Sequence, residues 1–285
     1  VQQRLFTSGA GGDSSSGTGG LTAFNSDGYS LGSAGNNNGN GVGYVAWNWK
    51  ANGAGSSNTD GSINSTATSV NTTAGISIVT YTGNGYSGAT VGHGLGAVPE
   101  MIIVKARSGS NNWAVYHKSI GATKYLRLNA TDAQATSTAR WNDTAPTSSV
   151  FSLGNDGEVN SNTVPYVAYC FAGKTGFSKF DKWTSTNNAD GAFVYTGFVP
   201  EFVMLKEYDG TNQWVLYDNL RPGYNQTSRA LFANGNDAEA TDLGIDILSN
   251  GYKIRSTNNQ NSGNYIYMAF GQSLVGSNNV PTTAR

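Results

Sequence analysis

Charged side chains are scarce in this sequence. Only 12% of the 285 residues are Asp, Glu, Lys or Arg, about half of the roughly 25% usual for a soluble globular domain. The 17 basic and 18 acidic side chains nearly cancel, which leaves a formal net charge of -1. Nucleic-acid binding needs an excess of Lys and Arg facing the phosphates, and so does binding to a membrane through a polybasic patch. We therefore expect neither partner.

Cysteine and long apolar runs are scarce as well. The one cysteine, Cys170, excludes an intrachain disulfide. Its place in the apolar run Tyr166–Phe171 predicts a buried thiol. No run approaches the roughly 20 apolar residues that span a bilayer, so we expect no membrane insertion. The chain opens on Val1 without a charged segment followed by an apolar one, and we expect no signal peptide there.

Motifs for zinc and for nucleotides are missing too. The spacings H-E-x-x-H and C-x-x-C do not occur. The segment Gly83–Gly88 fits G-x-G-x-x-G, but a dinucleotide site needs a helix directly after it. Ala89–Gly94 cannot form that helix, because it contains two glycines and three β-branched or ring side chains. The sequence therefore predicts no enzyme and no cofactor.

What the sequence does contain is a repeat at an interval of about 100 residues. Val98–Lys105 (VPEMIIVK) matches Val199–Lys206 (VPEFVMLK). Further along, Tyr166–Tyr169 (YVAY) matches Tyr265–Met268 (YIYM). The same pairing relates Trp113 to Trp214, Tyr116 to Tyr217 and Phe171 to Phe270. Aromatic side chains that recur in this way indicate core packing.

A third copy is visible only in its second half. Arg4–Phe6 corresponds to Ala230–Phe232, Phe24–Leu31 to Ile247–Ile254, and Gly43–Trp49 to Pro165–Phe171. The Pro-Glu and Trp segments of that copy do not occur in the sequence. We expect that the chain is the C-terminal part of something longer, or that another chain supplies the missing strands.

Local patterns predict strands throughout. Met101–Val104 and Phe202–Leu205 are short continuous apolar runs, which are typical of strands buried on both faces. Turn signals such as Asp27-Gly28 and Asn250-Gly251 separate the runs. We predict an all-β fold of tandem antiparallel β-sandwich (jelly-roll-like) repeats of about 100 residues.

The expected division of the chain follows from these repeats. Residues 1–50 form the back half of an incomplete repeat, and residues 51–74 form a flexible linker rich in Gly, Ser, Asn and Thr. Residues 75–172 and 173–285 form β-sandwich repeats, the second of which ends at the native C-terminus.

Several segments resemble a repeat domain of tail-fibre-like and other virion structural proteins of marine and cyanobacterial tailed phages. The matching segments are Ser77–Gly85, Val91–Gly96, Pro99–Lys105, Arg140–Asp143, Tyr166–Phe171 and Pro281–Arg285. The resemblance implies a particle-borne, extracellular protein that contacts other virion proteins and itself, as a homotrimer. It brings no known set of catalytic residues.

Aromatic residues without a repeat partner are the candidates for ligand binding. Tyr86, Trp141 and Tyr224 lie in polar segments rich in Gly, Asn and Thr, and His93 lies in the loop sequence Gly-His-Gly. Aromatic faces beside amide groups are what sugar-binding surfaces use. The competing interpretation is that these rings plug loops or contacts between subunits. The other histidine, His117, corresponds to Asp218, which predicts a surface or interface position.

Carboxylates give two further candidates. Asp156 and Glu158, with nearby asparagines, supply oxygen ligands for Ca²⁺, although the EF-hand pattern is incomplete. Asp132 and Asp143 lie in the same repeat as these two, and a glycosidase would need two of the four carboxyl groups roughly 5 to 10 Å apart. Asp132 has a repeat partner in Asp237, which favours a role in a turn or a cap.

The leading functional hypothesis is a tail-fibre-like virion protein that contributes to attachment to a bacterial surface glycan. The alternative is a purely architectural capsid-decoration or fibre-shaft protein without a ligand. A polysaccharide depolymerase is a distant third.

Overall fold

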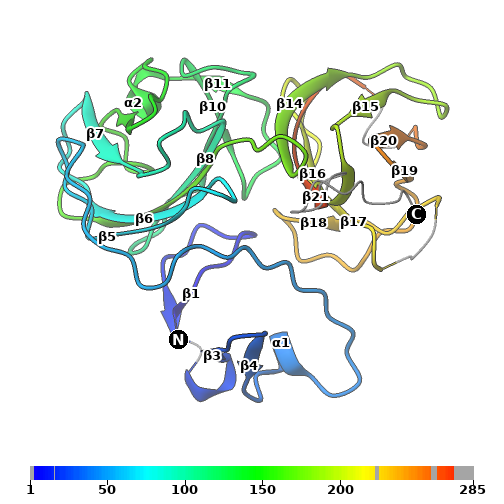
Figure 1. Cartoon of the computed structure of the whole chain (residues 1–285), viewed down its shortest axis with the longest axis horizontal. Coiled ribbons are helices and arrows are strands. Elements are labelled where there is room, and N and C mark those ends of the chain that lie inside the picture. The colour runs from blue at the N-terminus through cyan, green and yellow to red at the C-terminus, as the bar shows by residue number, and fades with distance from the viewer. Residues whose placement is uncertain (1–2, 16, 222–224, 258–261, 273–285) are drawn as a thin grey trace.

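The computed structural model describes residues 3–15, 17–221, 225–257 and 262–272. These residues form three lobes around a common centre (Figure 1): the N-lobe (residues 3–50), the M-lobe (51–172) and the C-lobe (from 173). Nearly all of the regular structure is antiparallel β-sheet, so the all-β prediction is confirmed. Within the described residues, no helix is long and apolar enough to cross a bilayer.

The M-lobe is built on a seven-stranded sheet in the order β11-β10-β9-β8-β13-β6-β5. A two-stranded ribbon of β7 and β12 contributes to the same apolar core. The elements are β5 (Ala67–Asn71), β6 (Ile76–Thr82), β7 (Ala89–Gly92), β8 (Met101–Ala106), β9 (Ala114–His117), β10 (Lys124–Arg127), β11 (Ala135–Thr136), α2 (Thr138–Trp141), β12 (Val150–Leu153) and β13 (Pro165–Phe171).

The C-lobe has a five-stranded sheet in the order β14-β21-β16-β17-β18, with β15-β20-β19 as its second sheet. This order corresponds strand by strand to β6-β13-β8-β9-β10 of the M-lobe. The elements are β14 (Ser178–Thr184), β15 (Phe193–Tyr195), β16 (Val199–Glu207), β17 (Val215–Asp218), β18 (Leu231–Phe232), β19 (Ile245–Leu248), β20 (Gly251–Ile254) and β21 (Asn264–Gln272).

The N-lobe is smaller, with two short hairpins, β1–β2 and β3–β4, followed by an extended segment over residues 43–50. Its elements are β1 (Gln3–Arg4), β2 (Ser14–Ser15), η1 (Gly17–Gly19), β3 (Leu21–Phe24), β4 (Tyr29–Leu31) and α1 (Gly35–Asn38).

Strand β8 shows why its apolar run is continuous. Successive side chains of a strand point to opposite faces of the sheet. Ile102 and Val104 enter the core of the M-lobe, whereas Met101 and Ile103 enter a second core that lies between the lobes. Every residue of β8 is buried, so the prediction of a strand covered on both faces is confirmed.

The core between the lobes has an aromatic cluster at its centre. The Phe171 and Phe270 ring centroids are 6.0 Å apart, and those of Trp49 and Phe270 are 5.6 Å apart. Each ring belongs to a different lobe, and all three occupy the positions that the repeat relates to one another. Edge-to-face contacts of this kind add to the free energy of burial. The three lobes therefore share one hydrophobic core and are not independent domains on a string of linkers.

Tryptophan side chains also bond one lobe to the next. The indole Nε1 of Trp113 in the M-lobe donates to the carbonyl oxygens of Phe6 and Gly9 in the N-lobe, at 3.1 and 3.2 Å. The indole Nε1 of Trp214 in the C-lobe donates to the carbonyl oxygen of Arg127 in the M-lobe, at 2.9 Å. Both rings are buried, as the repeat predicts.

Two buried lysines reinforce the same contacts. The Lys105 ammonium donates to the carbonyl oxygens of Asn111 and of Ala10 in the N-lobe, both at 2.8 Å. The Lys206 ammonium lies 2.9 Å from the Thr131 carbonyl oxygen in the M-lobe and 2.8 Å from that of Asn212. Burial lowers the pKa of both lysines, that of Lys206 to about 8. The carbonyls replace the water that each ammonium loses.

Residues 51–74 differ from the expected flexible linker. Residues 67–71 are strand β5, which pairs with β6 at the edge of the sheet, and Ile63 is buried in the M-lobe core. Hydroxyl groups satisfy the neighbouring backbone: Ser69 Oγ donates to the Gly53 carbonyl at 2.8 Å, and Ser65 Oγ accepts from the Asn58 amide at 2.7 Å. A composition rich in Ser and Thr is therefore compatible with fixed structure.

His117 lies at the contact between the M- and C-lobes. Its Nε2 is 3.2 Å from the Tyr267 carbonyl oxygen, and the Ser119 amide donates to its Nδ1. The sequence predicts a surface or interface position, and the contact with Tyr267 is such an interface. Burial lowers the pKa of His117 to about 4, from an ordinary value of 6.5, because the charged form would lose its hydration.

This pKa predicts a loss of stability in acid. The folded state binds fewer protons than the unfolded state, so the contribution of His117 is complete above pH 6.5 and falls as the pH drops towards 4. The loss reaches up to about 3 kcal/mol. Urea unfolding at pH 7 and pH 4.5 should show a smaller acid effect in His117→Gln than in the native chain. An equal acid effect in both proteins would contradict this assignment.

Candidate functional site

The residues that the sequence nominates for ligand binding do not converge. Tyr86 is 74% exposed, whereas His93 and Trp141 are 0% and 2% exposed. Tyr224 lies outside the described residues. Two of the four candidates are therefore core residues, and the expectation of exposed aromatic faces is wrong for them.

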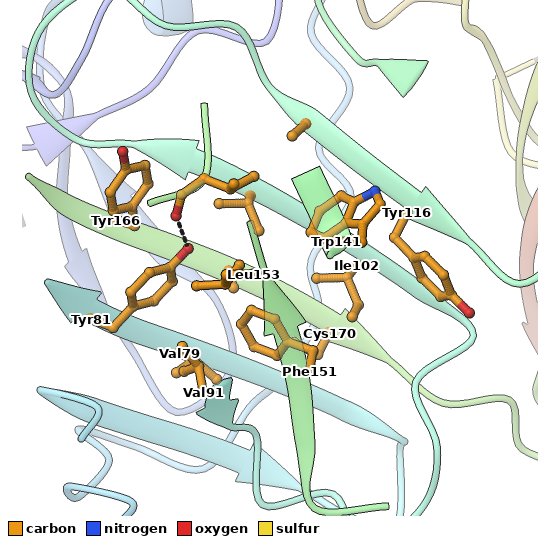
Figure 2. Packing of buried hydrophobic residues seen from close by; sticks show 14 of the residues in the cluster. Val79, Tyr81, Val91, Ile102, Tyr116, Trp141, Phe151, Leu153, Tyr166 and Cys170 are labelled. Atoms are coloured by element: carbon orange, nitrogen blue, oxygen red, sulfur yellow. Dashed lines mark hydrogen bonds between the residues drawn. The ribbon is translucent and has the colours of Figure 1, made fainter. Parts of the chain in front are cut away.

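Trp141 lies at the end of the short helix α2. Its ring packs edge-to-face against Tyr116, with the centroids 6.0 Å apart (Figure 2). The Ser137 side chain caps the start of α2, and Asn142 turns the chain sharply after it, with a φ of 51°. This tight turn directs the indole into the M-lobe core. The interpretation that such a ring plugs a loop describes Trp141 correctly.

His93 is held in a similar way. Its Nε2 lies 3.1 Å from the Thr147 carbonyl oxygen, and the Leu95 amide donates to its Nδ1. Burial lowers the pKa of His93 below its ordinary value. The imidazole thus fastens two loops together in its neutral form, and it is not an exposed loop side chain.

Tyr86 remains as an exposed ring on a fixed backbone. The buried Asn160 amide donates to the carbonyl oxygens of Tyr86 and Gly154, at 3.0 and 2.9 Å. Asn84 Oδ1 accepts from the Tyr86 amide at 3.0 Å, which holds the turn. A ring presented in this manner can stack on the apolar face of a sugar at little conformational cost.

The carboxylates proposed for Ca²⁺ are occupied by guanidinium groups. Glu158 accepts from Arg127 Nη2 at 2.8 Å and faces Arg140 Nη2 at 3.0 Å. Asp156 also pairs with Arg140. The Arg140 guanidinium lies over the Tyr125 ring, 4.4 Å from its centroid. In the part of the chain that the structure describes, no cluster of three or more metal-ligating side chains occurs. The arrangement is a structural ion network.

A serine within a G-x-S-x-G sequence does not have the geometry of a catalytic nucleophile. Gly28–Gly32 has the spacing G-x-S-x-G, which in α/β-hydrolases places a nucleophile on a turn between strand and helix. Here Ser30 lies inside β4, which pairs with β3, and its Oγ accepts from Asn25 Nδ2 at 3.1 Å. Both histidines of the chain are buried in the M-lobe. Ser30 therefore has no histidine to act as its base.

The feature that sequence reasoning did not single out is an apolar cavity of about 740 Å³ beside the central core. It is bordered by Leu5, Trp47 and Trp49 of the N-lobe, and by Phe232 of the C-lobe. The sequence signal for it is the alternation of Val45, Trp47 and Trp49 with polar or small residues. Those three side chains are part-buried, while the residues between them are exposed.

The ion network predicts that removing the charge of buried Glu158 destabilises the fold more than removing that of exposed Asp132. Glu158→Gln should lower the free energy of unfolding by about 2 kcal/mol, because Arg127 and buried Arg140 each lose a charged hydrogen-bond partner, although Arg140 keeps Asp156. Asp132→Asn is the matched control. Asp132 is 64% exposed and lies 3.7 Å from Arg127, so its loss should cost less than about 1 kcal/mol. Urea unfolding measures both.

The same network predicts how the chain responds to calcium. Thermal unfolding of the native chain should be unchanged by Ca²⁺ or by a chelator, because arginines already neutralise both carboxylates. A midpoint that rises with Ca²⁺ and loses this response in Glu158→Gln would contradict the structural role.

Comparison with known proteins places the chain in a family. No curated protein and no solved structure matches it. A family model described as a domain of unknown function (DUF7483) matches residues 1–273. Because this match covers nearly the whole sequence, the chain belongs to the DUF7483 family.

Proposed function

We propose that the chain is an architectural component of a tailed-phage particle, a capsid-decoration or fibre-shaft protein that needs no ligand. The resemblance of its sequence segments suggests the particle. The observation that carries the architectural role is the single core shared by three lobes, centred on Trp49, Phe171 and Phe270. A body fastened in this way resists separation of its lobes, which suits a mechanical role outside the cell.

The same proposal includes tandem jelly-roll-like units. The equal strand order of the M- and C-lobes supports two copies of one unit. The N-lobe fits as an incomplete copy, because β1–β2 pairs in the same register as β10–β11. Gln3 faces Ser15 as Lys124 faces Thr136.

A homotrimer remains part of the proposal, as the resemblance implies. The three lobes already surround one core within a single chain. A trimer would therefore bring together other surfaces, such as the outer edges of the sheets, which need cover.

Attachment to a bacterial glycan is the second candidate, and Tyr86 is the residue that favours it. This ring is 74% exposed, and the amide of buried Asn160 fixes its backbone. The exposed Asn162 lies beside Gly85, the neighbour of Tyr86, and its amide would orient sugar hydroxyls.

Binding to cells separates the two roles. Labelled chain is mixed with a panel of intact bacteria, before and after periodate oxidation of their surface sugars. The architectural role predicts no binding that oxidation abolishes. Attachment predicts binding that is lost on oxidation and reduced about tenfold or more in Tyr86→Ala, since burying an aromatic side chain against a ligand contributes about 1.5 to 3 kcal/mol. The thermal midpoint of Tyr86→Ala should equal that of the native chain, because the ring is exposed.

A further inference from the structure

The N-lobe has a gap where the M-lobe has two strands. In the M-lobe sheet, β9 and β8 lie between β10 and β13. The corresponding parts of the N-lobe are β1 and the extended segment 43–50, which the sequence relates to β13. Both parts border the apolar cavity of about 740 Å³: Gln3–Leu5, Trp47 and Trp49 line it together with residues of the M- and C-lobes, such as Ile103 and Met204.

The edges of this gap are open. Within the described part of the chain, no backbone group of residues 43–50 takes part in a backbone–backbone hydrogen bond. By contrast, β13 bonds to β8 on one edge and to β6 on the other. Trp47 and Trp49 also line two further cavities, of about 560 and 900 Å³. An extended segment with alternating side chains and unpaired edges is a template for added strands.

Two of three equivalent turns accept a hydrogen bond from an indole of the described residues, and the turn at Phe232 does not. In three matching turns the carbonyl oxygen of Phe6, Arg127 or Phe232 accepts from the amide three residues later, at 3.3, 3.3 and 3.5 Å. The Phe6 carbonyl also accepts from the indole of Trp113, and the Arg127 carbonyl from that of Trp214. Among the described residues, no indole donates to the Phe232 carbonyl, which borders the same cavity.

We propose that a β-hairpin of the same sequence type as β8–β9 and β16–β17, supplied from outside residues 1–285, inserts between β1 and residues 43–50. Its first strand pairs with residues 43–50, and its second strand pairs next to β1. A tryptophan in the second strand donates its indole N–H to the Phe232 carbonyl and closes the third contact between lobes. This inference rests on the sheet geometry and holds whether or not the chain is part of a phage particle.

The chemistry of the gap favours strands over a small apolar molecule. A hydrocarbon would cover Trp47 and Trp49 but would form no hydrogen bonds with residues 43–50, whose exposed backbone groups would still depend on water. A hairpin satisfies one edge of that segment and covers Trp47 and Trp49 in the same step. The two adjoining lobes already show this solution, with β8 beside β13 and β16 beside β21.

The test extends the chain with a known hairpin. A copy of residues 98–121, which contains β8 and β9, is joined directly ahead of Val1. This keeps the native connection length, because Gly121 precedes Lys124 by three residues and Lys124 occupies the register position of Gln3. Hydrogen exchange, followed by mass spectrometry of the full-length variant, should slow at alternate amides between Val45 and Trp49 by about tenfold or more, the effect of one added hydrogen bond.

Two controls make the result specific. The same extension in shuffled order should leave exchange at residues 45–49 unchanged. Trp113→Phe within the copied stretch keeps an aromatic side chain but removes the indole N–H donor, and it should reduce the protection. Equal exchange rates with the native and the shuffled extension would overturn the proposal. Protection of residues 45–49 in the unextended chain that grows with protein concentration would also overturn it, because a second copy would then be the occupant.

Discussion

The burial of three aromatic side chains at one point constrains the rest of this structure. Trp49, Phe171 and Phe270 each lie at or near the end of the corresponding segment of a different lobe, and the Phe270 ring centroid is 5.6 Å from that of Trp49 and 6.0 Å from that of Phe171. Because each segment brings this ring to the centre, one face of its sheet is covered by the other lobes. The tryptophan and lysine contacts between lobes then follow around that centre, where Trp214 and Lys206 meet carbonyl groups of the M-lobe.

This arrangement explains how a chain with few charges and no disulfide holds three lobes together. Apolar side chains on the sheet faces that point towards the other lobes supply the contact area. Buried N–H donors bond to carbonyl oxygens of the neighbouring lobe and fix its orientation. A buried donor without an acceptor is costly, so the indoles of Trp113 and Trp214 and the ammonium groups of two lysines favour the position in which a neighbouring carbonyl is available. The result is an interface whose geometry is set by hydrogen bonds and whose stability comes from burial.

Much of the fold could be predicted from the sequence, because strands buried on both faces have a plain apolar signature, as in VPEMIIVK, and because paired aromatics such as Trp113 and Trp214 recur. Cys170 is buried as predicted, and burial raises the pKa of its thiol. Residues 51–74 were harder to predict, since hydroxyl groups that bond to backbone look the same in sequence as those of a loose linker.

The candidate site was predicted less well, because composition does not reveal whether a side chain points into the core or towards solvent. Trp141 has polar neighbours, yet the left-handed turn at Asn142 directs it inward. Trp47 and Trp49, which the proposed hairpin would contact, fit the repeat and therefore look structural in the sequence. Only the arrangement of the strands in space shows that they border a cavity.

The most direct test of the shared core is a double-mutant cycle across two lobes, with Phe171→Leu, Phe270→Leu and the double variant. Their rings are 6.0 Å apart, so urea unfolding should give a coupling free energy of about 1 kcal/mol. Effects that add to within about 0.3 kcal/mol would mean that the two lobes do not share a core in solution.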